Sequence, residues 1–167
     1  MTIQSTRILG TLSRLDDTRG AVRMEDVYDT DLDDLWEAVS NPERLAGWLG
    51  IFSGDLRRGG TFHVTFRSTW DGPGRVDVCE APHHLLVTME PGTEDEAHIE
   101  AWLTAEGTGT RLIVEERGLP IGSLDVHGAG WQAHIEDLEH HLTGCGDGDW
   151  RSRWTALIPA YRAIAPA

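Results

Sequence analysis

The sequence contains no lysine, and all 14 of its basic residues are arginine. A Schiff base between a lysine side chain and a carbonyl substrate or pyridoxal phosphate is therefore excluded. The phosphate-binding loop G-x-x-x-x-G-K-[ST] and the strand lysine of protein kinases are excluded as well, because each of them needs that amine.

Cysteines are few, and long apolar runs are missing. Cys79 and Cys145 are far apart and form no C-x-x-C pair, so we expect no disulfide framework, and we expect Cys79 to be a small buried residue in a strand. No apolar run approaches the roughly 18 residues that suggest a membrane span. Residues 1–12 lack a charged region followed by an apolar one. We therefore expect a cytoplasmic protein with no membrane span.

Positive charge is also in short supply. The 28 acidic residues give a formal net charge of −14 and a pI near 4.8. Such a surface repels phosphate backbones and anionic lipids, so we expect no nucleic-acid partner. A chain of 167 residues is long enough to bury a core as one domain.

The N-terminal part predicts a hairpin. Residues 8–15 are moderately strand-like, and residues 16–20 form a turn signal. Apolar and polar residues then alternate from Ala21 to Tyr28, which predicts a second strand that pairs back on the first.

Two short helices are expected next. Thr30 resembles an N-cap with Asp33 three residues later, and leucine, tryptophan and valine side chains follow at helical spacing. Asn41 resembles a second N-cap, with Pro42 at the first helical position and Gly50 at the end.

After Gly50 the hydrophobic period changes from 3.6 residues to two. Alternating segments over residues 62–67, 76–79, 85–89, 98–103 and 112–114 predict strands. Residues 71–74 and 106–109 are the expected turns between them. Strands at this spacing predict an antiparallel sheet with one covered face.

Two helices are expected at the C-terminal end. Gly130 and Trp131 open the first, whose apolar face also carries His134, Ile135 and Leu138 at helical spacing. A second helix is expected from Trp150 to about residue 164, kinked or shortened by its proline.

These blocks, in this order, resemble the SRPBCC superfamily of START-like and Bet v 1-like proteins. The most similar subfamily is the activator of Hsp90 ATPase homologue 1-like group. The matching blocks include residues 34–36, 41–48, 55–60, 80–85, 109–112 and 130–131. The resemblance implies an α+β helix-grip fold, in which a curved antiparallel sheet wraps a long C-terminal helix and two short helices follow the first strands. It covers a core of about residues 20–143 in a single domain spanning residues 1–167. An extra N-terminal strand in residues 1–19 and a C-terminal helical extension over residues 145–167 lie outside it.

The resemblance also implies an apolar cavity between sheet and helix. We expect the cavity wall to include the following residues at inward positions: Phe66, Trp70, Val78, Glu116, Trp131 and Ile135. For Trp70, Trp131 and Ile135 a plain core position is the alternative.

Glu116 is the most informative of these residues. If the last strand continues past Val114, then Leu112, Val114 and Glu116 point the same way, toward the helix. An inward carboxylate needs a partner or a polar ligand, and burial would raise its pKa. The alternative is that the strand has ended and Glu116 is solvated or pairs with an arginine.

Metal and hydrolase motifs are missing. The histidines at 134, 140 and 141 do not form H-E-x-x-H, and no G-x-S-x-G occurs. The glycine-rich residues 144–148 follow a helix, so we interpret them as a linker and not as a dinucleotide loop. We expect no metal and no cofactor, and we assign no catalytic residue.

Fold alone does not give a function, so alternatives stay open. The first is binding of a small apolar or amphipathic molecule. The second is a cyclase- or hydrolase-type enzyme that uses polar groups in the cavity, Glu116 among them. The third is a protein-interaction domain like the Hsp90 activators. The tail helix with Trp150 and Trp154 could also pack on a second copy, so a homodimer is possible.

Overall fold

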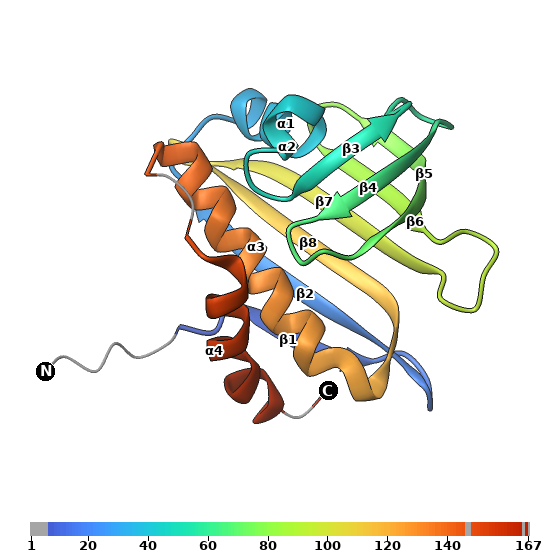
Figure 1. Cartoon of the computed structure of the whole chain (residues 1–167). Coiled ribbons are helices and arrows are strands. Elements are labelled where there is room, and N and C mark those ends of the chain that lie inside the picture. Colours follow the sequence, from blue (N-terminus) through green and yellow to red (C-terminus); the bar gives the residue numbers. More distant parts are fainter. Residues whose placement is uncertain (1–6, 146–147, 165, 167) are drawn as a thin grey trace, which may run out of the picture.

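The computed structural model describes residues 7–145, 148–164 and 166. Within them, eight strands form one antiparallel sheet in the order β1-β2-β8-β7-β6-β5-β4-β3. Figure 1 shows the sheet curving around the long helix α3, with α1 and α2 at one end and α4 beside α3. The strands are β1 (Gly10–Arg14), β2 (Arg19–Tyr28), β3 (Gly50–Gly54), β4 (Thr61–Phe66), β5 (Asp71–Glu80), β6 (His84–Met89), β7 (Ala97–Glu106) and β8 (Gly109–Pro120). The helices are α1 (Leu32–Ser40), α2 (Pro42–Leu45), the 3₁₀ turn Ile121–Ser123, α3 (Leu124–Thr143) and α4 (Trp150–Arg162).

The predicted helix-grip fold is confirmed. Each strand from β3 to β7 pairs with the next one along the chain. Strand β2 then pairs with β8, so the first and last strands of the segment β2–β8 lie side by side. Inward side chains of β1, β2, β7 and β8 pack with α3 in the main apolar core. Inward side chains of β4, β5 and β6 form a second, smaller cluster of Phe62, Val64, Val76 and Met89. No helix in the described part of the chain is long and apolar enough to cross a membrane.

The two short helices begin at side-chain caps. Asn41 caps α2 as predicted, because its side chain accepts a hydrogen bond from the Glu43 amide at 3.0 Å. The prediction of Thr30 as the cap of α1 was wrong. Asp31 holds that position and accepts a hydrogen bond from the Asp34 amide at 2.8 Å, while the Thr30 hydroxyl donates to the Asp34 carboxylate at 2.6 Å.

The predicted turn at residues 71–74 was also wrong, because these residues begin β5 and the chain turns over residues 67–70 instead. Gly72 lies under an aromatic ring, where an added Cβ would come within 2.5 Å of Trp70. Glycine here makes room for an indole and does not mark a turn. Strand β3, which pairs with β4, was not predicted. It has five residues, and glycines at both its ends hide the alternation.

Helix α3 starts at Leu124, six residues before the predicted opening at Gly130. Glycine inside this helix serves close packing: a Cβ on Gly128 would lie 2.6 Å from the ring of Tyr161. The Tyr161 hydroxyl donates to Gln132 on α3 at 2.5 Å and accepts from the Gly10 amide at 3.0 Å. Tyr161 therefore ties α4 to α3 and to β1.

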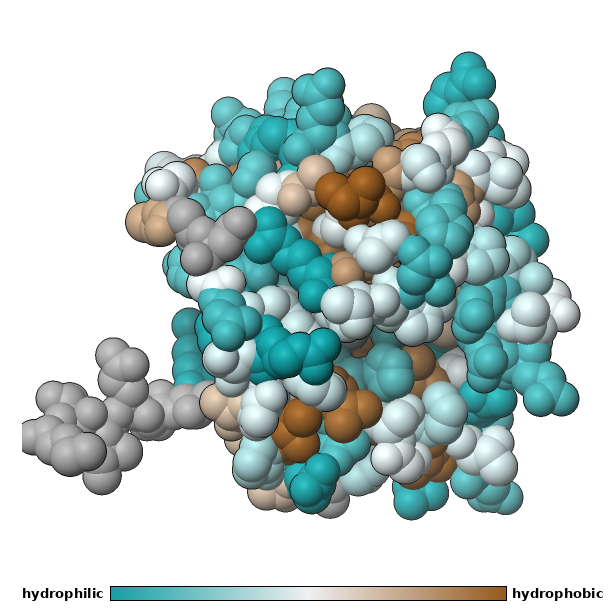
Figure 2. Space-filling view, in the orientation of Figure 1, coloured by the Kyte–Doolittle hydropathy of each residue, from teal (hydrophilic) through white to brown (hydrophobic). Residues whose placement is uncertain are grey.

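The predicted C-terminal helix is present as α4, and Pro159 lies inside it. The predicted linker at residues 144–148 is described only in part, because residues 146 and 147 lie outside the described residues. Figure 2 shows one face of the molecule as mostly hydrophilic, with hydrophobic residues confined to small separate spots.

Candidate functional site

Two adjoining cavities lie between the sheet and α3 in the part of the chain that the structure describes. The large chamber has a volume of about 610 Å³, and the small chamber about 380 Å³. Both lie in the range of known small-molecule sites. The residues that line both chambers, and so form the boundary between them, are Phe66, Met89, Ile99 and Trp131.

The small chamber is almost entirely apolar. Leu85, Ala101 and Val114 lie opposite one another on β6, β7 and β8 and form one row of its wall. Polar side chains come only from Ser40 and Arg57 among its lining residues. Besides the four boundary residues, the other lining residues are Trp36, Val39, Leu45, Trp48, Leu49, Phe52, Leu56, Phe62, Val76, Cys79 and Val87.

An arc of rings lines the large chamber. Centroid distances along it are 5.6 Å from Trp70 to Phe66, 6.1 Å from Phe66 to His134, 5.1 Å from His134 to Trp150 and 5.6 Å from Trp150 to Trp154. The centroid of the Trp131 ring lies 5.7 Å from that of the His134 ring. The sheet, α3 and α4 therefore each contribute rings to one wall.

The tryptophans are concentrated around these chambers. All seven lie within the described residues, and six of them line one chamber or both. Trp102 is the exception. It stacks on His84 at 5.8 Å, away from either chamber.

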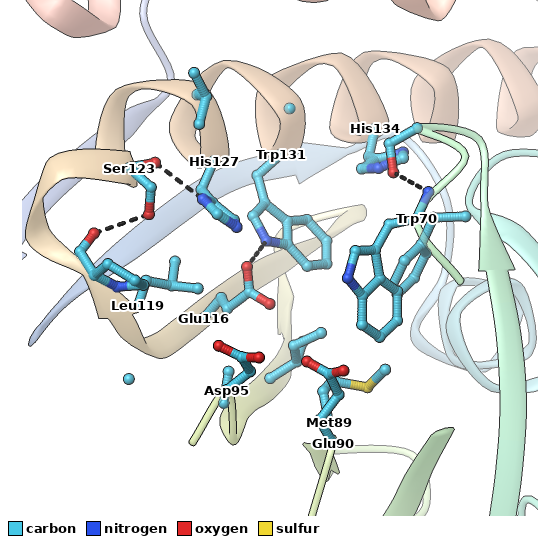
Figure 3. Close-up of a pocket in the computed structure, with 18 of the residues that line it drawn as sticks. Trp70, Met89, Glu90, Asp95, Glu116, Leu119, Ser123, His127, Trp131 and His134 are labelled. Atoms are coloured by element: carbon cyan, nitrogen blue, oxygen red, sulfur yellow. Dashed lines mark hydrogen bonds between the residues drawn. The ribbon is translucent and has the colours of Figure 1, made fainter. Parts of the chain in front are cut away.

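Glu116 lies in the large chamber because β8 continues past Val114 to Pro120. The Trp131 indole N–H donates to its carboxylate at 3.1 Å (Figure 3). Burial raises the pKa of Glu116, while the nearby His127 and the indole hydrogen bond act in the opposite direction. His127 is fixed through Nδ1, which lies 2.9 Å from the Ser123 carbonyl and donates to it. The site thus places an inward carboxyl between a tryptophan and a histidine.

His134 is buried at the centre of the aromatic arc. Burial, together with the positive charges of Arg67 and Arg153, lowers its pKa to about 3. The ring is therefore neutral near pH 7, and its Nδ1 has no hydrogen-bond partner among the described residues. His134 thus adds an uncharged polar ring to the wall.

The structure brings four of the predicted site residues together and leaves two aside. Phe66, Trp70, Glu116 and Trp131 all line the large chamber. Ile135 is buried in the core, where its carbonyl accepts a hydrogen bond from the Tyr28 hydroxyl at 3.4 Å.

Val78 lines neither chamber because of a β-bulge in β5. Val76 pairs with Val87 and Val78 pairs with Leu86, so one extra residue lies between them. The bulge reverses the alternation, and Cys79 takes the place in the small-chamber wall that the sequence pattern gives to Val78.

Several lining residues were not among the predicted site residues. His127 and His134 come from α3, Trp150 and Trp154 from α4, and others from the β6–β7 loop. The spacing of Trp150 and Trp154 could have placed them on one helix face, but only the tertiary contact between α4 and α3 places that face at the cavity. The described residues contain no group of three metal-binding side chains.

Cys79 offers a chemical probe of the small chamber. Burial raises the pKa of its thiol, whereas Cys145 is exposed. Because the thiolate is the reactive form, we expect Cys79 to react at least roughly tenfold more slowly than Cys145 with iodoacetamide at pH 7.5. Peptide mass spectrometry over a time course measures both rates. Equal rates would show that Cys79 is open to solvent.

A model of the family described as activator of Hsp90 ATPase homolog 1-like protein matches residues 29–143 of this chain. No curated protein matches its sequence. Among solved structures, CalU16 from Micromonospora echinospora is 24% identical with a TM-score of 0.77, and the match covers 93% of this chain and 96% of that one. A Bordetella parapertussis protein is 20% identical with a TM-score of 0.73, covering 100% of this chain and 97% of that one. DynU16, described as a putative protein in the dynemicin biosynthetic locus, is 27% identical with a TM-score of 0.70. That match covers 77% of this chain but only 50% of DynU16.

Proposed function

Because this chain belongs to the family of activator of Hsp90 ATPase homolog 1-like proteins, whose fold commonly binds ligands, we propose that it binds one small amphipathic molecule between its sheet and α3. The apolar part of the molecule occupies the small chamber, and its polar part lies in the large chamber. The ring of Trp131 lies at the boundary and contacts both parts.

The placement of the tryptophans carries this proposal. Six of seven face space that side chains leave open, although a core without a ligand would gain stability from filling that space. Large rigid aromatic side chains give much contact area to a ligand at small entropic cost. Their arrangement around two chambers supports a binding role.

The polarity of the walls supports an amphipathic molecule. The small chamber has an apolar wall, which favours a hydrocarbon or aromatic group. The large chamber adds Glu116, His127 and His134, which can orient a polar group. The description of DynU16 as a protein of a biosynthetic locus is in line with a small organic molecule as the partner.

Fluorescence of N-phenyl-1-naphthylamine tests the proposal. This uncharged probe brightens in an apolar site, and we expect saturable binding of one molecule per chain at micromolar concentration. Emission from the chamber tryptophans should fall in parallel, because six of the seven indoles are near the probe. A weak response that rises linearly without saturation would mean surface association and would contradict a binding cavity.

A further inference from the structure

We infer that the large chamber binds a positively charged nitrogen group, such as an alkylammonium, at the polar end of the ligand. This inference rests on the proposed binding function and specifies its ligand class. Carboxylates without ion pairs, arginines that are already engaged and a wall of aromatic rings together carry it.

Three carboxylates line the large chamber without an ion-pair partner among the described residues. They belong to Glu90, Asp95 and Glu116, and none of them forms a salt bridge. Asp95 is exposed, and His127 lies near Glu116 without a salt bridge to it. Figure 3 shows the three side chains on one side of the chamber, facing the rings of Trp131 and Trp70. A ligand cation in this space would supply the missing partner.

The two arginines that line the large chamber, Arg19 and Arg151, pair with none of its three carboxylates among the described residues. Arg19 donates to the backbone carbonyls of Gly118 at 3.2 Å and Glu94 at 3.0 Å. Arg151 is exposed and lies over the ring of Trp154, 5.9 Å from its centroid. This contact also shows that the aromatic wall accepts a cation on a ring face.

The aromatic arc suits a cation better than an anion. The faces of tryptophan rings carry negative electrostatic potential, and they attract ammonium groups within about 6 Å. His134, in the middle of the arc, is neutral near pH 7, and the arginines that act on it, Arg67 and Arg153, both pair with the Asp137 carboxylate. Trp70, Trp131, Trp150 and Trp154 line the same chamber as the carboxylates.

Two residues at or next to the wall of the large chamber have a strained backbone. Among the described residues, Thr69 with φ 74° and Glu90 with φ 49° are the non-glycine residues in the left-handed region. A β-branched residue adopts this conformation rarely, and such strain clusters at functional sites. Thr69 lies next to Trp70, and Glu90 lines the chamber itself. The strained residues therefore place one ring and one carboxylate at the proposed cation site.

Glu116 supplies the innermost negative charge. Burial raises the pKa of this carboxyl in the free protein. A cation beside the carboxylate stabilises the ionised form in return, so ligand binding and ionisation of Glu116 favour each other.

Three amphiphiles with the same chain test the charge preference: octyltrimethylammonium, octanol and octyl sulfate. Each is titrated by calorimetry at pH 7.5, the two ionic compounds below their micelle concentrations and octanol below its solubility limit. We expect the ammonium compound to bind at least roughly tenfold more tightly than octyl sulfate, which corresponds to about 1.4 kcal/mol. We expect octanol to fall between them.

Matched variants locate the charge. Glu116→Gln keeps a hydrogen-bond acceptor for Trp131. We expect this variant to bind octyltrimethylammonium roughly tenfold more weakly, and to bind octanol with an affinity within about twofold of the wild type. Glu115→Gln is the control, because Glu115 is the next residue of β8, pairs with Arg117 at 3.3 Å and lines neither chamber. It should leave all three affinities within about twofold. Glu90→Gln repeats the test if the first variant does not fold.

The outcomes separate the two proposals. Equal affinity for all three compounds, or tightest binding of octyl sulfate, would overturn the cation inference and leave the binding function intact. Equal losses in the Glu115 and Glu116 variants would attribute the preference to net charge and would also overturn it. If none of the three compounds binds, and N-phenyl-1-naphthylamine does not bind either, both proposals fail.

Discussion

Arg153→Ala is expected to lower the free energy of unfolding by about 3 kcal/mol or more. Arg153 on α4 pairs with Asp137 on α3, and the Asp137 side chain is completely buried. Arg153 also donates to Glu136 at 3.0 Å and to the Ala133 carbonyl at 3.2 Å. Without Arg153, the buried Asp137 carboxylate loses this close ion pair, while Arg67 lies 3.9 Å away. The melting temperature should fall by roughly 6–12 °C.

Arg162→Ala is the matched control for this variant. Arg162 also joins α4 to α3, through Asp125 at 3.1 Å, but its side chain is 68% exposed. An exposed pair contributes less than about 1 kcal/mol, so this variant should melt within roughly 4 °C of the wild type. Urea unfolding of both variants measures the difference. Equal, small losses would show that the buried pair does not hold α4 in place.

Ala101→Phe is expected to weaken binding of N-phenyl-1-naphthylamine by at least roughly tenfold. Ala101 lies between Leu85 and Val114 in the wall of the small chamber. The new ring would take up the space that the apolar part of a ligand needs. Adding bulk to a filled core destabilises a protein by about 1–3 kcal/mol. If the small chamber is empty, Ala101→Phe should lower the free energy of unfolding by less than that.

Thr104→Phe adds the same ring to the same strand at an exposed position, three residues along on the opposite face of the sheet. We expect it to bind the probe with wild-type affinity. Fluorescence titration and thermal unfolding of both variants complete the comparison. If Ala101→Phe binds normally, or unfolds as an overpacked core does, the small chamber does not hold the ligand.

Helix α4 extends the site beyond the family match. The matched region ends at residue 143, whereas Trp150, Arg151 and Trp154 line the large chamber from the following helix. Gly128 allows the close approach of α4, because any side chain there would collide with Tyr161. Under the proposed function, residues outside the family match therefore contribute to the ligand preference of this chain.

Much of the sheet could be predicted from the sequence. Strands β7 and β8 alternate regularly, and the inward direction of Glu116 follows once β8 is known to continue to Pro120. The caps of α1 and α2 depend on local hydrogen bonds, and Asp31 and Thr30 are both good candidates for one cap. Which of two adjacent residues caps the helix depends on the backbone geometry, which the sequence does not show.

The rest of the site depends on contacts between distant segments. The bulge before Val78 reverses which residues of β5 face inward, and no residue pattern marks it. Gly72 and Gly128 serve close approach to Trp70 and Tyr161, although glycine in a sequence favours a turn or a helix end. Trp150 comes to the cavity only because α4 folds back on α3.

The most direct test of ligand binding in these chambers is a two-dimensional ¹H–¹⁵N spectrum of the seven tryptophan indoles during titration with N-phenyl-1-naphthylamine. Trp131 lies at the boundary of both chambers and should shift most, and the other chamber indoles should shift with it. The resonance of Trp102, which stacks on His84 away from the chambers, should stay in place. Saturation of the probe with an unmoved Trp131 signal, or with a shift at Trp102 alone, would contradict a ligand site between the sheet and α3.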